Sequence, residues 1–252
     1  MRVAALYDIH GNLPALEAVL KEVREAGPDL VVVGGDVIPG PMVRETLDLL
    51  FDLDLPTRFI HGNGESAALA VRNGGGEGLF PDAVRPVMEW TAEQLDQRVA
   101  AALAEWTLTT TVMDGPHRLL FCHATPRDDN EIFTSVTPVE RLESAFRGVD
   151  ASVVVCGHIH IQYSRSVASI GIWNAGSVGM PFDAPGAYWL LLEDGDVTFR
   201  RTEYDLEDAA RRIRMTAYPQ ADEFAAGNVL RPPARDAMEP RLEQMAEPPP
   251  RD

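Results

Sequence analysis

The sequence predicts an α/β fold, and three observations carry that prediction. Short apolar segments that end in polar residues alternate with stretches of helical periodicity, which is the pattern of repeated βαβ units. The segment "DLVVVGGD" (29–36) is apolar on both faces, as is expected of a parallel strand buried between two layers. The chain of 252 residues has an ordinary length for one α/β domain, so we expect no second full domain.

The first quarter of the chain contains two such units in order. "RVAALYD" (2–8) is predicted to be a strand and residues 13–27 a helix, because the apolar side chains of the helix recur on one stripe. After the strand at 29–36, a helix over 43–53 leads to a third strand, "TRFIHGN" (57–63).

The middle of the chain continues the alternation. Residues 66–110 have helical periodicity, interrupted by a Gly-rich loop, and are expected to lie over one face or edge of the sheet. Strands are predicted at 117–123 and 151–158, with a helix between them at 137–146. "AYWLLLEDGDVTFRRTEY" (187–204) is typical of a hairpin, because its Asp-Gly pair fits a tight turn.

The end of the chain changes in composition. After a last helix near 205–215, residues 231–252 are rich in Pro and charge and lack apolar periodicity. We expect them to be a disordered or loosely attached tail, so that a single domain spans residues 1–230.

The charge balance restricts the partners. The 22 Lys and Arg residues against 39 Asp and Glu residues give a formal net charge of −17, which repels nucleic acid and anionic membranes. An anionic substrate would therefore need local compensation, such as bound cations. We recognise no leader and no apolar run of about 20 residues. Cys122 and Cys156 end apolar runs, where a small buried hydrophobe is a commoner interpretation than a disulfide. These features favour a soluble, cytoplasmic protein of unknown oligomeric state.

A polar side chain follows each strand that is predicted to be buried. These side chains are carboxylates, imidazoles and one amide: Asp8, His10, Asp36, Asn63, His123, His158 and His160. Because ligands bind at the carboxyl ends of the strands in open α/β sheets, the seven residues are expected to converge. Any one of them alone is equally well explained as a hydrogen-bonded polar residue at a strand end, but the whole set is not.

The donor types of this set suit a metal. Carboxylate, imidazole and amide groups bind Mn²⁺, Fe, Zn²⁺, Co²⁺ or Ni²⁺, and the absence of a thiolate cluster argues against a structural zinc site. One carboxylate placed between two such sets of ligands can bridge two ions. The sequence therefore predicts a metal centre.

Five short motifs carry a resemblance to a known family. "DIHGN", "GGD", "HGNGE", "CHATP" and "GHIH" match, in order and spacing, the motifs of the calcineurin-like metallophosphoesterases. The resemblance covers about residues 1–200, and "NAGSVGMPFD" (174–183) resembles a loop of a bacterial branch of small phosphodiesterases. The resemblance to this family implies a four-layer sandwich of two mixed β-sheets flanked by α-helices. The alternation of strand and helix patterns alone predicts only an α/β fold.

The resemblance also implies a ligand set and an activity. One divalent cation would be held by Asp8, His10 and His160, the other by Asn63, His123 and His158, and Asp36 would bridge them. A bridging hydroxide would attack a small phosphodiester, which makes Asp36, Asn63 and His123 the catalytic candidates. Manganese is the expected metal, and Fe, Zn²⁺, Co²⁺ or Ni²⁺ are the alternatives.

Three further residues are candidates for the substrate side. Asn12 either supports a metal ligand or caps the helix at 13–27, and the sequence favours neither. Asn174 and Ser177 belong to the phosphodiesterase-like loop, although a Gly-Ser turn needs no function to explain it.

One position departs from the family pattern. Many relatives have a histidine after G-N, which is thought to assist the leaving group, whereas this chain has Gly64 there and keeps the acidic residue as Glu65. This departure disfavours a phosphomonoesterase or protein phosphatase more than it disfavours metal chemistry. His61 is a candidate general acid, or else a hydrogen-bonded strand-end residue.

Three other functions are alternatives to a phosphodiesterase. A phosphomonoesterase or protein phosphatase uses the same ligands. A non-catalytic interaction scaffold has usually lost ligands, and none is replaced here. A nuclease is disfavoured by the acidic balance and by the lack of a basic stripe.

Overall fold

The computed structural model describes residues 1–246, which form two five-stranded sheets in the orders β10-β9-β1-β2-β3 and β4-β5-β6-β8-β7. The strands are β1 (Arg2–Leu6), β2 (Leu30–Val33), β3 (Thr57–Phe59), β4 (Thr109–Asp114), β5 (His117–Cys122), β6 (Val153–Cys156), β7 (Gln162–Val167), β8 (Ile170–Ala175), β9 (Ala187–Glu193) and β10 (Asp196–Thr202). Strands β1, β2 and β3 are parallel, as are β5, β6 and β8, and the other pairs are antiparallel. Both sheets are therefore mixed.

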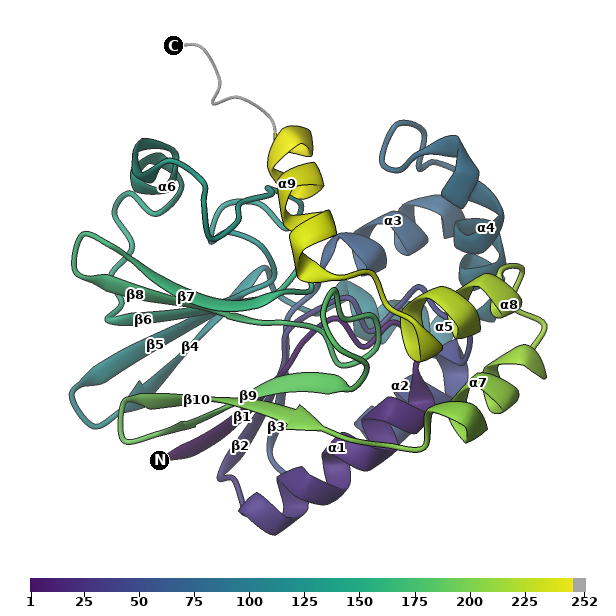
Figure 1. The fold of residues 1–252 in the computed structure, drawn as a ribbon, viewed down its shortest axis with the longest axis horizontal. Coiled ribbons are helices and arrows are strands. Elements are labelled where there is room, and N and C mark those ends of the chain that lie inside the picture. Colours follow the sequence, from purple (N-terminus) through teal and green to yellow (C-terminus); the bar gives the residue numbers. More distant parts are fainter. Residues whose placement is uncertain (247–252) are drawn as a thin grey trace.

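Helices cover the outer faces of the sheets. They are α1 (Leu13–Ala26), α2 (Val43–Phe51), α3 (Asn63–Arg72), η1 (Asp82–Val84), α4 (Arg85–Gln94), α5 (Gln97–Ala104), α6 (Val139–Ala145), α7 (Leu206–Arg214), α8 (Ala221–Phe224), η2 (Ala225–Leu230) and α9 (Arg235–Met245). Figure 1 shows the two sheets one above the other, with α1 beneath the first and α6 above the second. None of these helices is long and apolar enough to span a membrane within the described residues.

Strand β1 shows how the layers arise from the sequence. Val3 and Ala5 lie in the apolar cluster between the sheets, whereas Ala4 and Leu6 pack with the helices on the outer face. Successive side chains of a strand point to opposite faces, so a strand that is apolar throughout needs a cover on both sides. A separate cluster lies between the second sheet and α6. The predicted four-layer sandwich of two mixed sheets flanked by helices is confirmed.

The hairpin expected at 187–204 is present as β9 and β10. Asp194 and Gly195 form the turn between them with φ of 52° and 84°. Two consecutive positive φ values are what a tight hairpin turn requires, and Asp-Gly supplies them at little cost. Residues 66–110 hold the end of α3, then η1, α4 and α5, which pack on the outer face of the first sheet beside α1 and α2.

The end of the chain differs from the expected disordered tail. Residues 235–245 form α9, and its Leu242 is buried in the cluster on the outer face of the second sheet. Glu239 accepts hydrogen bonds from the backbone N–H and the hydroxyl of Ser135, at 3.1 and 2.5 Å. This part of the expected tail is thus docked, and residues 247–252 lie outside the described residues.

The sequence pattern of α9 explains why it was not expected to be ordered. The helix contains Pro240 and buries a single apolar side chain, so it has no apolar periodicity. Its attachment depends on polar pairs instead: Glu243 accepts a hydrogen bond from the Thr134 hydroxyl at 2.7 Å and pairs with Arg141 at 3.2 Å. Contacts of this kind join residues about a hundred positions apart and leave no local signal.

Candidate metal centre

The seven side chains predicted as metal ligands gather where the strand ends of the two sheets meet. The first sheet contributes the four that follow β1, β2 and β3, and the second sheet contributes the three that follow β5 and β6. Across the two sheets, His160 Nε2 lies 3.3 Å from Asp8 Oδ1 and 3.1 Å from His10 Nε2. The rings of His123 and His158 lie 5.2 Å apart. The convergence expected from the sequence is therefore present in the fold.

The backbone at five of these residues is in the left-handed region. The φ angles are 53° at Asp8, 48° at His10, 49° at Asp36, 71° at His158 and 58° at His160. Residues other than glycine rarely adopt this conformation, and it costs on the order of 1 kcal/mol or more at each position. Such strain persists only where the surroundings impose it, and it concentrates at functional sites.

Backbone hydrogen bonds between the loops impose this conformation. The N–H of Asp8 donates to Gly35 at 3.1 Å, and that of His10 donates to the carbonyl of Asp36 at 3.0 Å. On the second sheet, Gly157 donates to the carbonyl of His123 at 2.8 Å. Each ligand-bearing loop is thus tied to the neighbouring loop, and the ligands form one rigid group.

Three of the imidazoles are oriented by backbone carbonyls. The Nδ1 atom of His10 lies 3.1 Å from the Pro39 oxygen, and that of His160 lies 2.7 Å from the Met180 oxygen. His123 Nδ1 makes the same contact with Gly34 at 2.9 Å. Because a carbonyl only accepts, each Nδ1 carries the proton, and each Nε2 presents a lone pair to the centre of the site.

Several ligand atoms have no hydrogen-bond partner. Among the described residues, buried atoms without a partner include Asp8 Oδ1, Asn63 Oδ1, His123 Nε2 and His158 Nε2. In addition, the lone pairs of His10 and His160 face each other at 3.1 Å. Burying an acceptor without a partner costs free energy, and divalent cations bound at the site would satisfy these atoms.

The pKa values of His10, His158 and Asp8 favour the forms that bind metals, whereas that of Asp36 is raised. Burial lowers the pKa of His10 and of His158 to about 3, so that both rings are neutral near pH 7. Burial raises the pKa of Asp8, but the His160 and His123 imidazoles outweigh this effect and bring it to about 2. Burial and the Asp8 carboxylate raise the pKa of Asp36. A cation between the carboxylates would remove the repulsion that opposes ionisation of both.

The residues fit two cation positions. The ligand atoms of Asp8, His10 and His160 lie within 4.8 Å of one another, as do those of Asp8, Asp36 and His123. Asp36 directs one carboxylate oxygen to each group, with Oδ2 at 3.8 Å from His10 Nε2 and Oδ1 at 3.6 Å from His123 Nε2. A carboxylate with one oxygen toward each group has the arrangement of a bridging ligand.

Gly64 and Glu65 hold the Asp36 loop, which sequence reasoning missed. The N–H of Gly64 donates to Asp36 Oδ1 at 2.7 Å, and a Cβ at position 64 would lie 2.1 Å from the Ile38 oxygen. Glu65 accepts from the N–H groups of Asp36, Ile38 and Gly62 at 2.9, 3.1 and 2.8 Å. The Gly62-to-Glu65 spacing is that of a capping box and was the available signal.

The three residues expected on the substrate side are buried and have structural partners. Asn12 caps α1 by accepting from the N–H of Ala15 at 3.3 Å, which is the second of its two interpretations. Asn174 donates to the Gly157 carbonyl at 2.6 Å. Ser177 donates to the Asp8 carbonyl at 2.6 Å. These contacts brace the loops that carry the ligands, and a direct contact of these residues with substrate stays a prediction.

His61 lies beside the centre with a partner of its own. Its Nδ1 is 3.1 Å from Asp129 Oδ2, an oxygen that also accepts from the Ser66 hydroxyl at 2.7 Å. The hydrogen bond to Asp129 raises the pKa of the His61 imidazole. His117 is at the start of β5, next to the Gly195 turn.

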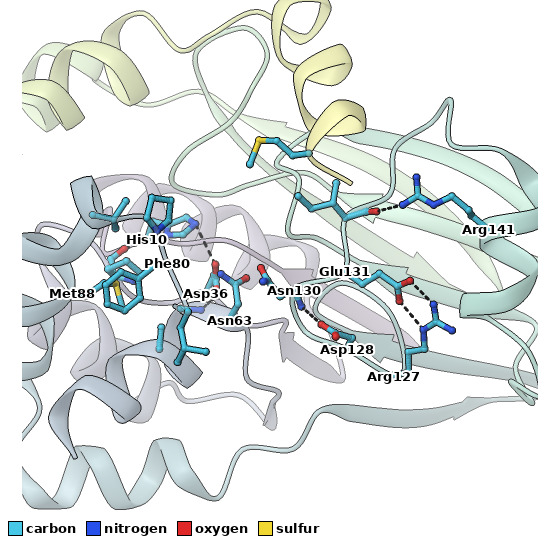
Figure 2. Close-up of a pocket in the computed structure, with 18 residues that line it drawn as sticks. His10, Asp36, Asn63, Phe80, Met88, Arg127, Asp128, Asn130, Glu131 and Arg141 are labelled. Carbon is cyan, nitrogen blue, oxygen red and sulfur yellow. Dashed lines mark hydrogen bonds and ion pairs between the residues drawn. The ribbon is translucent and has the colours of Figure 1, made fainter. Parts of the chain in front are cut away.

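A cavity of about 890 Å³ opens over the centre and is lined by His10, Asp36, Asn63 and Gly64 among others (Figure 2). Its volume is within the range of sites for small molecules. The ligand group, through His10, Asp36 and Asn63, therefore forms the floor of a pocket that can admit a substrate.

Comparison with known proteins gives one family. A model of the calcineurin-like phosphoesterase superfamily domain matches residues 1–195. The uncharacterized protein MJ0912 of Methanocaldococcus jannaschii is 25% identical over 239 residues, which cover 86% of this chain and 94% of that protein.

Two solved structures are similar over most of the chain. Hypothetical protein PH1004 from Pyrococcus horikoshii OT3 has a TM-score of 0.75 at 20% identity, with 89% of this chain and 97% of that chain covered. A metallophosphoesterase from Sphaerobacter thermophilus has a TM-score of 0.69 at 26% identity, with 91% and 99% covered.

Proposed function

Because the chain belongs to the calcineurin-like phosphoesterase superfamily, we propose that it hydrolyses phosphodiesters with the help of two divalent cations. Membership supports a metal-dependent hydrolase of phosphate esters, and the preference for diesters is the part that we add. The observation that carries the proposal is the convergence of the seven predicted ligands, several of whose buried atoms lack a hydrogen-bond partner.

The proposed roles of the ligands are those that the family resemblance implies. Asp8, His10 and His160 would hold one cation, and Asn63, His123 and His158 the other, with Asp36 between them. When bound, such cations neutralise the phosphoryl oxygens of the ester and lower the pKa of water, which makes hydroxide available near neutral pH.

The protein contributes rigidity and orientation. The carbonyls of Pro39, Gly34 and Met180 keep the Nδ1 proton on each imidazole, so that Nε2 is free to bind without rearrangement. The N–H of Gly64 and the Glu65 carboxylate hold Asp36 in its strained conformation. A site preorganised in this way loses little free energy when substrate binds.

Two features of the pocket favour diesters over monoesters. Position 64 has no room for a side chain, so it provides no donor for the second charge of a monoester dianion. The two arginines that line the pocket are already paired with carboxylates, Arg127 with Glu131 and Arg141 with Glu243. A diester has one negative charge fewer and needs less compensation.

The test combines metal analysis with a graded series of esters. Purified protein should contain about two divalent cations per chain, with manganese the expected metal. Values of kcat/KM should fall steeply from aryl to alkyl diesters, because position 64 supplies no acid to protonate a poor leaving group. A positioned general acid contributes on the order of 10²–10⁴ in rate. Faster cleavage of matched aryl monoesters would contradict the proposal and favour a phosphomonoesterase.

His61 is the proposed source of a proton if the series is flat. A flat series in the wild type that becomes steep in His61→Ala would assign the proton to His61. If the purified protein contains no metal and hydrolyses none of the esters, this result would instead favour a non-catalytic scaffold.

A further inference from the structure

The pocket over the metal centre has two unlike walls. Figure 2 shows Phe80 and Met88 on one side of Asp36 and Asn63, and Arg127, Asp128, Glu131 and Arg141 on the other. The first wall is apolar and comes from α3 and from residues 79–88, and the second is polar and comes from residues 127–141. The two ester arms of a phosphodiester held over Asp36 would therefore meet different surroundings.

Both arginines of the polar wall are paired with carboxylates. Arg127 pairs with Glu131 through two contacts, at 2.8 and 2.5 Å. Arg141 pairs with Glu243 at 3.2 Å and donates to the Ile132 carbonyl at the same distance. Asp128 accepts from the N–H of Asn130 at 2.7 Å and adds a negative charge. This wall offers hydrogen bonds to a neutral polar group but no unpaired cation for a second phosphate.

The apolar wall exposes hydrophobic side chains beside a polar floor. Leu79 is 54% exposed, and the half-buried ring of Phe80 lies next to it with Val84 and the buried Met88 behind. From α9, Met245 reaches the same pocket and is 65% exposed. Apolar surface around a polar reaction centre is typical of a site that takes the apolar part of a ligand out of water.

We propose that the substrate is a diester with a single phosphate and one apolar arm, and that this arm lies against the wall formed by Leu79, Phe80, Val84 and Met88. The other arm is polar and uncharged and lies against the Arg127–Glu131 wall. This inference rests on the proposed phosphodiesterase activity and narrows it. Dinucleoside polyphosphates are excluded as preferred substrates, because their additional charges would meet Asp128 and paired arginines.

The test uses two phosphinates, which have no ester bond for a phosphoesterase to hydrolyse. Methyl(phenyl)phosphinate and dimethylphosphinate carry the same single charge, and one methyl arm of the second is replaced by a phenyl arm in the first. Isothermal titration of the manganese-loaded full chain should give a dissociation constant about tenfold lower for methyl(phenyl)phosphinate, from the apolar area that the single phenyl arm buries. In the double variant Leu79→Ser/Phe80→Ala, the ratio of the two constants should fall below about threefold.

A control variant and melting curves distinguish an effect of the apolar wall on ligand binding from a general loss of folded protein. Met113 is 56% exposed on β4 and does not line the pocket, so Met113→Ala removes apolar surface elsewhere and should keep the wild-type ratio. Melting curves of all three proteins show whether each is folded, and the ratio cancels any loss common to both ligands.

The outcomes distinguish this inference from the proposed function. Equal affinities in the wild type, or a ratio that the double variant does not change, would overturn the inference whether or not diesters are hydrolysed. A tenfold ratio that collapses in the double variant supports the apolar wall even if no diester is turned over, and in that case the proposed function alone fails. A higher kcat/KM for a dinucleoside tetraphosphate than for aryl diesters would also overturn the inference.

Discussion

The floor and the walls of the pocket are built in different ways. On the floor, the ligands follow buried strands, and their remaining polar atoms are bound by the backbone of a neighbouring loop, as with His160 and Met180. The walls come from the 79–88 segment, the 127–132 loop and the end of α9, and they contain exposed apolar groups and surface ion pairs.

We therefore expect the floor to determine whether the reaction occurs and the walls to determine which substrate is preferred. Substitution on the floor leaves a buried atom without its partner or its cation, and the cost of such a defect is large. Substitution on a wall changes half-exposed groups, whose individual contributions are small. The two regions should therefore respond to mutation by different amounts and in different measurements, and the predictions below test this.

The largest effect is expected from the carboxylate between the two imidazole groups. Asp36→Asn removes the negative charge that faces His10 and His123, so metal content and turnover should both fall, turnover by at least on the order of 10²-fold, above the range for outer-shell partners. Metal analysis and kcat measure the two losses. His117→Ala, beside the Gly195 turn, is the control and should be close to wild type. Unchanged turnover of Asp36→Asn at full metal content would remove Asp36 from the site.

A smaller effect on the floor is expected from a single methyl group. Gly64→Ala would place a Cβ 2.1 Å from the Ile38 oxygen and 2.9 Å from Asp36 Oδ1, so the loop must move. We expect a loss of about 1–3 kcal/mol in the free energy of unfolding, with weaker metal binding. Gly227 has no atom within 4 Å of an added Cβ, and Gly227→Ala should change stability by less than about 1 kcal/mol in either direction. Equal denaturation midpoints for the two variants would show that position 64 is not tightly packed.

The sequence predicted the floor better than the walls for a physical reason. Residues such as Asp8 and His123 follow apolar strands. The carboxyl ends of parallel strands lie at the same edge of a sheet, and this does not depend on the conformation of the loops. The contacts of Glu65 with the Asp36 loop were partly readable from the spacing to Gly62. The apolar wall could not be predicted from the sequence, because the exposed Leu79 is not part of a periodic apolar pattern.

The same reasoning applies to α9, where the expectation from sequence differs from the structure. Polar pairs such as Glu239 with Ser135 stabilise a helix without any local pattern of apolar residues. The charged, Pro-containing segment is docked because it contacts residues about a hundred positions earlier in the chain, such as Ser135.

The buried side of α9, which does not line the pocket, should contribute stability more than chemistry. Leu242→Ala removes a buried side chain and should lower the free energy of unfolding by about 2–3 kcal/mol, which corresponds to roughly 5–10 °C in Tm for a chain of this size. Metal content should not change, because no predicted ligand belongs to α9. Gln244→Ala on the exposed side of the same helix is the matched control. A loss of metal from Leu242→Ala would mean that walls and floor are coupled.

The smallest effect is expected from the pH dependence of the α9 attachment. Burial raises the pKa of Glu239, but the hydrogen bonds from Ser135 and Arg235 outweigh it, so the folded-state pKa lies below the ordinary value of 4.5. A carboxylate whose pKa is lowered by folding stabilises the protein above the unfolded-state pKa, and this contribution is lost as the pH falls through the folded-state pKa. Glu239→Gln should therefore be less stable than the wild type at pH 7, by about 1 kcal/mol, and the difference should decrease as the pH falls below 4.5.

A double-mutant cycle with Ser135→Ala decides whether the contact itself causes that difference. The side-chain oxygens of Ser135 and Glu239 are 2.5 Å apart, so the two single substitutions should be non-additive at pH 7, and the coupling should be smaller at pH 3, because protonation of the carboxyl weakens the contact. Thermal unfolding of the four proteins at the two pH values measures the coupling. Full additivity at pH 7 would show that the contact between Ser135 and Glu239 does not stabilise the helix, and its attachment would then depend on Leu242 and on the pairs of Glu243.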